Sequence, residues 1–230
     1  MPREASSLTA IPKESMRDRV LRALRSAIVS GEMEPGRVYS APYLAGRFGV
    51  SATPVREAML DLARENMVTI VPNKGFRVTE VDDATLDQIT QIRQLLEPPV
   101  VARVTPIIPE ADLGELRRLA EQIVSWAKAS NLVEYTEADR VFHLKLLSYA
   151  GNPRLVELVS DLRAQTRLLN LTTLLEQGRL TEAAEEHLTI VELIRARDVG
   201  AVEAYLRRHL GQVRTTWARQ PGQSRSEPAS

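Results

Sequence analysis

The chain has 230 residues, with 30 basic and 30 acidic side chains, no cysteine and an aromatic content of only 4%. This length accommodates one large domain or two small ones, since domains commonly contain about 100–150 residues. A net charge of zero excludes attachment to nucleic acid or to an acidic membrane through bulk charge alone. The lack of cysteine excludes disulfides, thiolate metal ligands and a cysteine nucleophile. The few aromatic residues favour an aliphatic core between helices.

No uninterrupted apolar run approaches the ~18–20 residues that a membrane span requires. Charged side chains occur throughout the first thirty residues, which is incompatible with the apolar region of a secretory signal peptide. We therefore expect a soluble cytoplasmic protein that has no membrane partner.

The two ends of the chain differ in charge and in pattern. Residues 1–80 contain 12 basic and 9 acidic side chains, so this segment has a net charge of +3 and the remainder a net charge of −3. The basic segment is the one expected to meet an anionic partner. Residues 1–12 and 220–230 lack apolar periodicity and are predicted to be disordered tails.

Three short helices are predicted near the N-terminus. Apolar residues at every fourth position predict a first helix over 15–30. A second helix is predicted over 40–48, with Ser40 as its N-cap, and a third over 51–66, with Ser51 as its N-cap. Two helices separated by a short break are the arrangement of a helix-turn-helix.

A small β-hairpin is predicted after these helices. Two β-rich runs, 67–71 and 76–79, flank the turn-forming segment 72–75, Pro-Asn-Lys-Gly. The polar segment 80–83 follows as a connector. The sequence thus predicts a winged helix-turn-helix over 13–80.

The remainder of the chain is predicted to be an all-α bundle. Apolar stripes at helical spacing recur from Ala84 to Arg219 and no strand pattern occurs, so residues 84–217 are expected to form about six helices. Pro98 and Pro99 lie inside the first of these helices and are expected to kink or end it. The predicted fold class is mainly α, with an N-terminal winged helix and a C-terminal helical bundle.

The predicted winged helix contains side chains that suit contact with DNA. In such a unit the N-terminus of the last helix enters the major groove, where hydroxyl groups bind phosphate and an arginine binds guanine or phosphate. Basic side chains on the preceding helix and on the hairpin suit the backbone or the minor groove. Each of these residues alone is equally compatible with a solvated surface. The candidates are Arg47, Ser51, Thr53, Arg56, Lys74 and Arg77.

The chain has only three histidines, and all three lie in the predicted helical bundle. Asp139 and His143 are four residues apart and therefore share one helical face, while His187 and His209 lie on two later helices. Together they offer nitrogen and oxygen ligands suited to Zn²⁺, Ni²⁺, Mn²⁺ or Fe²⁺. The spacing leaves open the alternative that each histidine is an ordinary helix residue.

Residues 35–78 resemble the winged helix of the GntR family of bacterial transcription regulators. The resemblance implies that Thr53 and Arg56 contact DNA from the recognition helix and that Gly75 lies at the wing tip. Most members have arginine where this chain has Ala52, so one base contact is expected to be missing. The matching segments are Pro35-Gly36-Arg37, Leu44-Ala45, Pro72-Asn73-Lys74-Gly75-Phe76 and the specific block Gly49-Val50-Ser51-Ala52-Thr53-Pro54-Val55-Arg56-Glu57-Ala58.

Residues 84–216 resemble the FCD effector domain of the FadR-type subfamily. The matching segments are Arg93-x-x-Leu96-Glu97, Asp139-x-x-Phe142-His143, Ala150-Gly151-Asn152-x-x-Leu155, Glu186-His187-x-x-Ile190 and Ala204-x-x-x-Arg208-His209-Leu210. The resemblance implies a divalent metal ion, with zinc favoured. Its implied ligands are Asp139, His143, His187 and His209.

The same resemblance implies that open positions on the ion bind a small carboxylate effector. Arginine side chains near the ion would then pair with the acid. Arg93 is one candidate for this role. Arg167 and Asn170, which share one helical face with Arg163, are further candidates.

The two resemblances together imply a ligand-responsive transcription regulator, by family habit more often a repressor. It is expected to bind double-stranded DNA as a homodimer at a pseudo-palindromic operator, and no catalytic residues are expected. The first alternative is a metal-dependent enzyme acting on a small organic acid. It is disfavoured because no HExxH motif is present and because Glu186 is expected on a different helical face from His187. The second alternative is a DNA-binding protein with a purely structural metal.

Overall fold

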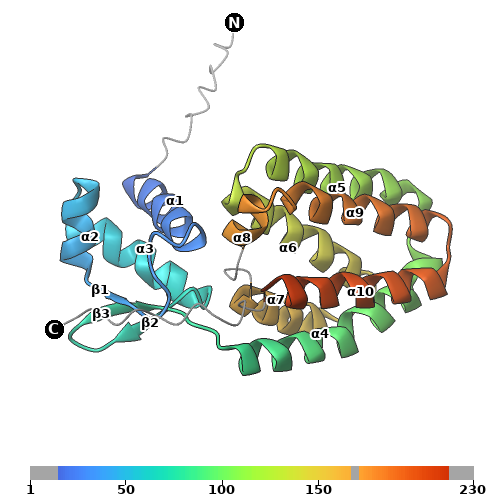
Figure 1. The fold of residues 1–230 in the computed structure, drawn as a ribbon, viewed down its shortest axis with the longest axis horizontal. Helices are drawn as coiled ribbons and strands as arrows, with labels where there is room; N and C mark the ends of the chain where they lie inside the picture. Colours follow the sequence, from blue (N-terminus) through green and yellow to red (C-terminus); the bar gives the residue numbers. More distant parts are fainter. Residues whose placement is uncertain (1–14, 167–170, 218–230) are drawn as a thin grey trace, which may run out of the picture.

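The computed structural model describes residues 15–166 and 171–217, which are mostly helical (Figure 1). The expected mainly α fold class is therefore confirmed. The predicted tails lie outside the described residues, as do Arg167 and Asn170. None of the helices in the described ranges combines the length and the apolar character needed to cross a bilayer.

Three helices make up most of the N-terminal unit. The side chain of Ser15 accepts a hydrogen bond from the Asp18 backbone N–H (3.1 Å), and Ser40 accepts one from Tyr43 N–H (3.3 Å). These bonds satisfy N–H groups that a helix start otherwise leaves unpaired. The predicted helices are confirmed as α1 Met16–Val29, α2 Ala41–Phe48 and α3 Ala52–Arg64.

A three-stranded antiparallel sheet completes this unit as the wing. Its order is β1-β3-β2, with β1 Val38–Tyr39, β2 Val68–Val71 and β3 Gly75–Val78. The β2–β3 hairpin confirms the predicted one, whereas β1 was missed because two residues are too few to show alternation. Gly75 has a φ of +133°, and a Cβ there would lie 2.3 Å from the Tyr39 carbonyl oxygen. Only glycine therefore fits where β3 passes β1.

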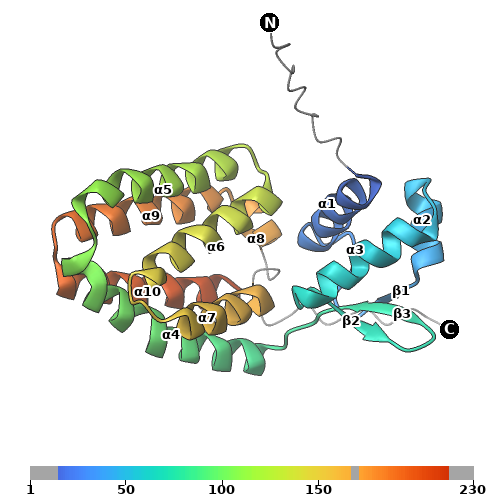
Figure 2. The same ribbon diagram turned by 180° about the vertical axis from the view of Figure 1, so that it is seen from behind.

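The C-terminal unit contains α-helices and two short 3₁₀ turns, with no strand among its described residues. Helices α5 and α9 lie side by side on one side, α4 and α10 lie side by side on the other, and α6 runs between them (Figures 1 and 2). About six helices were expected; the described part has seven, because the six-residue α8 is too short to show a periodic stripe. Their bounds are α4 Asp83–Val104, α5 Leu113–Lys128, α6 Leu132–Ser148, α7 Pro153–Thr166, α8 Leu171–Glu176, α9 Leu180–Arg195 and α10 Val199–Trp217.

Helix α4 continues through Pro98 and Pro99, so of the two expected outcomes, a kink or an end, the end does not occur. Proline lacks the N–H that would bond the carbonyl four residues earlier, which for Pro98 is the Gln94 carbonyl. Arg207 of α10 donates its Nη1–H to that oxygen instead, at 3.1 Å. A neighbouring helix thus supplies the hydrogen bond that the proline cannot.

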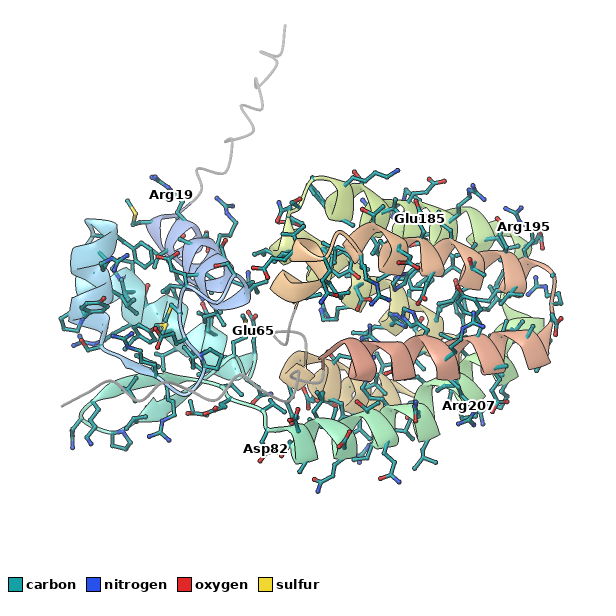
Figure 3. The ribbon with its side chains drawn as sticks, in the orientation of Figure 1. Arg19, Glu65, Asp82, Glu185, Arg195 and Arg207 are labelled. Atoms are coloured by element: carbon teal, nitrogen blue, oxygen red, sulfur yellow. The ribbon has the colours of Figure 1, made fainter. Side chains whose placement is uncertain are left out.

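The two units meet where α1 packs against α6. The α3 C-cap, Glu65, lies on the side of the winged helix that faces the bundle, and Asp82 lies at the start of α4 (Figure 3). A cavity of about 530 Å³ opens at this junction, lined from the winged helix by residues that include Arg25 and Glu65 and from α6 by residues that include Glu137 and Arg140. The junction is therefore polar and incompletely packed.

Candidate metal centre and DNA-binding surface

Three helices bring the expected ligand residues together inside the bundle. Asp139 and His143 come from α6, His187 from α9 and His209 from α10. Each residue offers one ligand atom, and these four atoms all lie within 4.8 Å of one another. The three imidazoles are buried. The spacing in the sequence therefore corresponds to one cluster in space.

The separations within the cluster suit a single small ion. The Nε2 atoms of His143 and His187 are 3.2 Å apart, and His187 Nε2 lies 3.0 Å from Asp139 Oδ1. The third separation, from His143 Nε2 to Asp139 Oδ1, is 3.7 Å. Two ligands each about 2.1 Å from one ion are roughly 3.0–3.4 Å apart. The cluster is therefore close to the geometry that a bound divalent ion requires.

In two of the histidines, a hydrogen bond at the outer ring nitrogen, Nδ1, determines that the other ring nitrogen, Nε2, is available to a metal ion. His187 donates its Nδ1–H to the Ala184 carbonyl at 3.1 Å, and His209 donates its Nδ1–H to Glu186 Oε2 at 2.5 Å. With this tautomer, His187 Nε2 and Asp139 Oδ1 are two acceptors in contact, an arrangement that a shared cation stabilises. Outer-nitrogen partners of this kind are typical of metal-ligating histidines.

The position of Glu186 corrects the sequence-based expectation. It was expected to point away on a different helical face from His187. Glu186 directly precedes His187 on α9 and therefore points in a different direction. Because α10 packs beside α9, the Glu186 carboxylate reaches Nδ1 of His209 on that helix. A contact between residues on two helices leaves no signal in the spacing of either helix.

A buried chain of charges adjoins the cluster. Arg163 of α7 donates to Asp139 Oδ2 and, at 2.9 Å, to Glu97 Oε2. Arg93, the predicted effector-binding arginine of α4, donates its Nε–H to Glu97 Oε1 at 2.6 Å. Arg163 is thus the arginine in direct contact with a candidate ligand. No role of its own was predicted for Arg163, because its partners lie 24 and 66 residues away in the chain.

These charges set the protonation states of the cluster. Burial alone raises the pKa of Asp139, but the Arg163 guanidinium, together with His143 and His187, outweighs burial and holds that pKa well below its ordinary value. Burial, together with Arg163, holds the pKa of His143 well below its ordinary value, and burial also lowers the pKa of His209. An ionised carboxylate beside neutral imidazoles is the state that binds a metal ion.

The N-terminus of α3 presents the predicted recognition residues to solvent. Ser51, Thr53 and Arg56 are exposed. Ser51 is the N-cap residue of α3, yet its hydroxyl makes no capping hydrogen bond. Within the described ranges Arg56 has no ion-pair partner. These polar groups are therefore available at the end of the helix that a helix-turn-helix inserts into DNA.

The predicted contacts outside α3 lie on α2 and on the wing. Arg47 is exposed on α2, where its guanidinium lies 3.5 Å from both the Tyr43 hydroxyl and a Glu32 carboxylate oxygen. Lys74 is exposed in the β2–β3 turn, and Arg77 is exposed on β3. Gly75 follows the turn as the first residue of β3, so the tip itself is formed by the residues before it.

Two known families match the two units. Residues 16–78 match the family described as "Bacterial regulatory proteins, gntR family". Residues 88–212 match the family described as "FCD domain".

Regulators from several bacteria are similar over most of the chain. The HTH-type transcriptional regulator McbR of Escherichia coli K12 is 29% identical over 76% of this chain and 80% of its own length. The HTH-type transcriptional repressor RspR of the same strain is 27% identical, over 88% of this chain and 89% of its own length. The uncharacterized HTH-type transcriptional regulator YdhC of Bacillus subtilis 168 is 33% identical over 81% of this chain and 84% of its own length.

Solved structures give the same picture of the fold. The structure of E. coli McbR/YncC superposes with a TM-score of 0.65 at 28% identity, covering 87% of this chain and 95% of that one. A GntR regulator from Rhodococcus sp. RHA1 superposes with a TM-score of 0.62 at 22% identity, covering 88% of this chain and 97% of that one.

Proposed function

Because this chain belongs to the gntR family of bacterial transcription regulators and contains an FCD domain, we propose that it is a sequence-specific repressor whose affinity for its operator is set by a small carboxylate effector. In this proposal residues 13–80 bind DNA, and residues 84–217 bind the effector and dimerise. The observation that carries the proposal is the buried cluster of one aspartate and three histidines behind a winged helix with exposed basic residues. Repression is supported by the relative described as a repressor.

DNA binding in this proposal uses the exposed face of the winged helix. Thr53 and Arg56 contact base edges in the major groove. Ser51 binds phosphate with its hydroxyl, which makes no capping hydrogen bond. The remaining contacts go to the backbone or the minor groove. They come from Arg47, Lys74, Gly75 and Arg77.

A homodimer places two winged helices on the two halves of a pseudo-palindromic operator. The family and its usual dimeric state support this arrangement. So do Ile92 and Leu95, aliphatic side chains of α4 that are 41% and 65% exposed in the single chain. A regulator of this kind acts in the cytoplasm, where the bacterial chromosome lies.

The residues of the cluster fit a divalent ion, for which zinc suits three imidazoles and one carboxylate best. When bound, the ion supplies a positive charge and open coordination positions for an acid. Asp139, His143, His187 and His209 hold it, and Glu186 keeps the His209 ring oriented. Of the proposed effector-binding residues, Arg93 acts through its pair with Glu97, while Arg167 and Asn170 lie outside the described residues.

The link between effector and DNA runs through α6 and α7 in this proposal. One face of α6 carries Asp139 and His143. Glu137, which precedes Asp139, and Arg140, which lies between the two, line the cavity that faces the winged helix. A small shift of α6 at the metal centre therefore changes the surface on which α1 rests. Two arrangements of this junction with different DNA affinities are sufficient for regulation.

A gel-shift assay on the DNA upstream of the chain's own gene tests the DNA-binding half of the proposal. We expect binding at low salt that weakens steeply as salt rises, because phosphate contacts release counterions. Absence of binding at low salt by both the chelator-treated and the zinc-loaded protein, with and without small acids, would contradict it.

A thermal-shift screen of small carboxylates, run with and without chelator, tests the effector half. We expect at least one acid to raise the Tm of the zinc-loaded protein, because a ligand of the native state stabilises it. The effect should disappear with chelator and in His187→Ala. Stabilisation by zinc with no response to any acid would indicate a structural metal, and turnover of an acid would indicate an enzyme.

A further inference from the structure

Tyr135 lies on the same face of α6 as the two metal-centre residues of that helix. It precedes Asp139 by four residues and His143 by eight, so the three side chains follow one another along the helix. The Tyr135 side chain is buried, with an exposed fraction of 7%. Its ring therefore packs in the core, one helical turn before Asp139.

The Tyr135 hydroxyl has no hydrogen-bond partner among residues 15–166 and 171–217. Tyr149 and Tyr39 differ in this respect. The Tyr149 hydroxyl donates to Asp112 Oδ2 at 2.8 Å, and the Tyr39 hydroxyl accepts from the Glu34 backbone N–H at 3.0 Å. A buried hydroxyl without a partner is destabilising, and native proteins usually provide one. The unpaired Tyr135 hydroxyl therefore indicates that a bound ligand is its hydrogen-bond partner.

Charged residues of the candidate metal centre influence this hydroxyl. Burial raises the pKa of Tyr135, and the negative charges of Asp139 and Glu186 raise it further, while Arg163 opposes them. All three of these residues belong to the cluster or contact it. The phenol therefore remains protonated and offers an O–H donor one helical turn before Asp139.

We propose that the Tyr135 O–H donates a hydrogen bond to an oxygen atom of the acid that binds at the metal centre. This inference rests on the proposed function, since it requires an effector at that centre. The effector must then offer an acceptor oxygen on the Tyr135 side, in addition to the atom next to the ion. Tyr135 is thereby a specificity-determining residue, and a ligand that places an apolar group there binds weakly.

The experiment compares three full-length zinc-loaded proteins by calorimetric titration with acetate, lactate, malate and citrate. The variants are Tyr135→Phe and, as a control at the opposite end of α6, Tyr149→Phe, whose hydroxyl is already paired. We expect Tyr135→Phe to bind the tightest of these acids about 10- to 100-fold more weakly than wild type, with unchanged zinc affinity. Tyr149→Phe should bind that acid like wild type.

The Tm values of the same proteins without acid provide a readout that a structural role would not reproduce. Tyr149→Phe should lower the Tm because it removes a made hydrogen bond. Tyr135→Phe should leave the Tm unchanged or raise it because it removes an unpaired buried hydroxyl.

Three results would overturn the inference while leaving the proposed function in place. They are wild-type acid affinity in Tyr135→Phe, a loss of zinc affinity in that variant, or a fall in its acid-free Tm as large as that of Tyr149→Phe. Failure of all four acids to bind wild type would instead withdraw the proposed effector site, and the role of Tyr135 with it.

Discussion

The outer ring nitrogens of His187 and His209 are both engaged by the protein, one by the Ala184 carbonyl and the other by the Glu186 carboxylate. Each bond holds the ring orientation and leaves Nε2 as the free nitrogen. Since a metal ion needs its ligands already oriented and deprotonated, residues that never touch the ion affect its affinity.

Replacing Glu186 should therefore weaken zinc binding although Glu186 is not a ligand. We expect Glu186→Ala to reduce zinc affinity by about 10- to 100-fold, because His209 loses the partner that orients its ring. Competition with a chromophoric chelator measures this. The neighbouring Glu185 is exposed on the same helix (Figure 3), so Glu185→Ala is the control and should match wild type. Equal affinities for both variants would remove Glu186 from the centre.

Replacing Arg56 should weaken DNA binding at every sequence tested. We expect Arg56→Ala to lower operator affinity by about 10-fold or more, since a charged contact to guanine or phosphate is lost. Fluorescence anisotropy at several salt concentrations measures the affinity and its salt dependence. Arg195, on α9 in the helical bundle (Figure 3), provides the control variant Arg195→Ala. Unchanged affinity in Arg56→Ala would exclude it from the DNA-binding surface.

The residues of the centre were predictable to different degrees for a physical reason. Asp139 and His143 are four residues apart, a spacing that places them on one helical face. His187 and His209 were candidate ligands because the chain has only three histidines. Arg163 and Glu186 were not identifiable, because their contacts depend on which helices become neighbours. Tyr135 carries no sequence signal either, since its missing hydrogen bond is visible only in three dimensions.

Among the elements, those with local signals were predictable. Serine N-caps, apolar stripes and the Pro-Asn-Lys-Gly turn are properties of a few neighbouring residues, and they correctly indicated α1, α2, α3 and the β2–β3 hairpin. The strand β1 depends on pairing with β3, which is distant in the sequence. The continuity of α4 likewise depends on α10, which the sequence around Pro98 cannot reveal.

The stability of α4 at its prolines should depend on Arg207. We expect Arg207→Ala to lower the free energy of unfolding by about 1 kcal/mol, because the Gln94 carbonyl loses its donor. In a Pro98→Ala background the same change should cost less, since alanine restores the backbone N–H. Urea denaturation of the four proteins in this double-mutant cycle gives the coupling. Strictly additive effects would contradict the explanation given for the unbroken helix.

At the scale of the whole molecule, α6 is the element common to both units. It supplies two residues of the candidate metal centre and also meets α1 of the winged helix. No sequence pattern predicts this contact, because the surfaces at the junction are polar on both sides. The cavity of about 530 Å³ there indicates an interface with little dense packing to resist rearrangement.

Arg140 should hold the two units together across this junction. Its guanidinium is hydrogen-bonded to Glu137 (2.5 Å) and is attracted by Glu65 of the winged helix. We expect Arg140→Ala to speed hydrogen exchange in α1 without changing zinc affinity. Arg154, exposed on α7, provides the control Arg154→Ala. Wild-type exchange in α1 of the Arg140 variant would show that this residue does not couple the units.

We propose that Asp139, His143, His187 and His209 hold one divalent ion, on which effector binding depends. Calorimetric titration of zinc into chelator-treated full-length protein tests it most directly, with His187→Ala alongside. Wild type should bind one ion per chain, and the variant, which lacks one of four ligands, should bind with affinity at least about 100-fold lower. No stoichiometric zinc binding by wild type, or equal binding by His187→Ala, would contradict it.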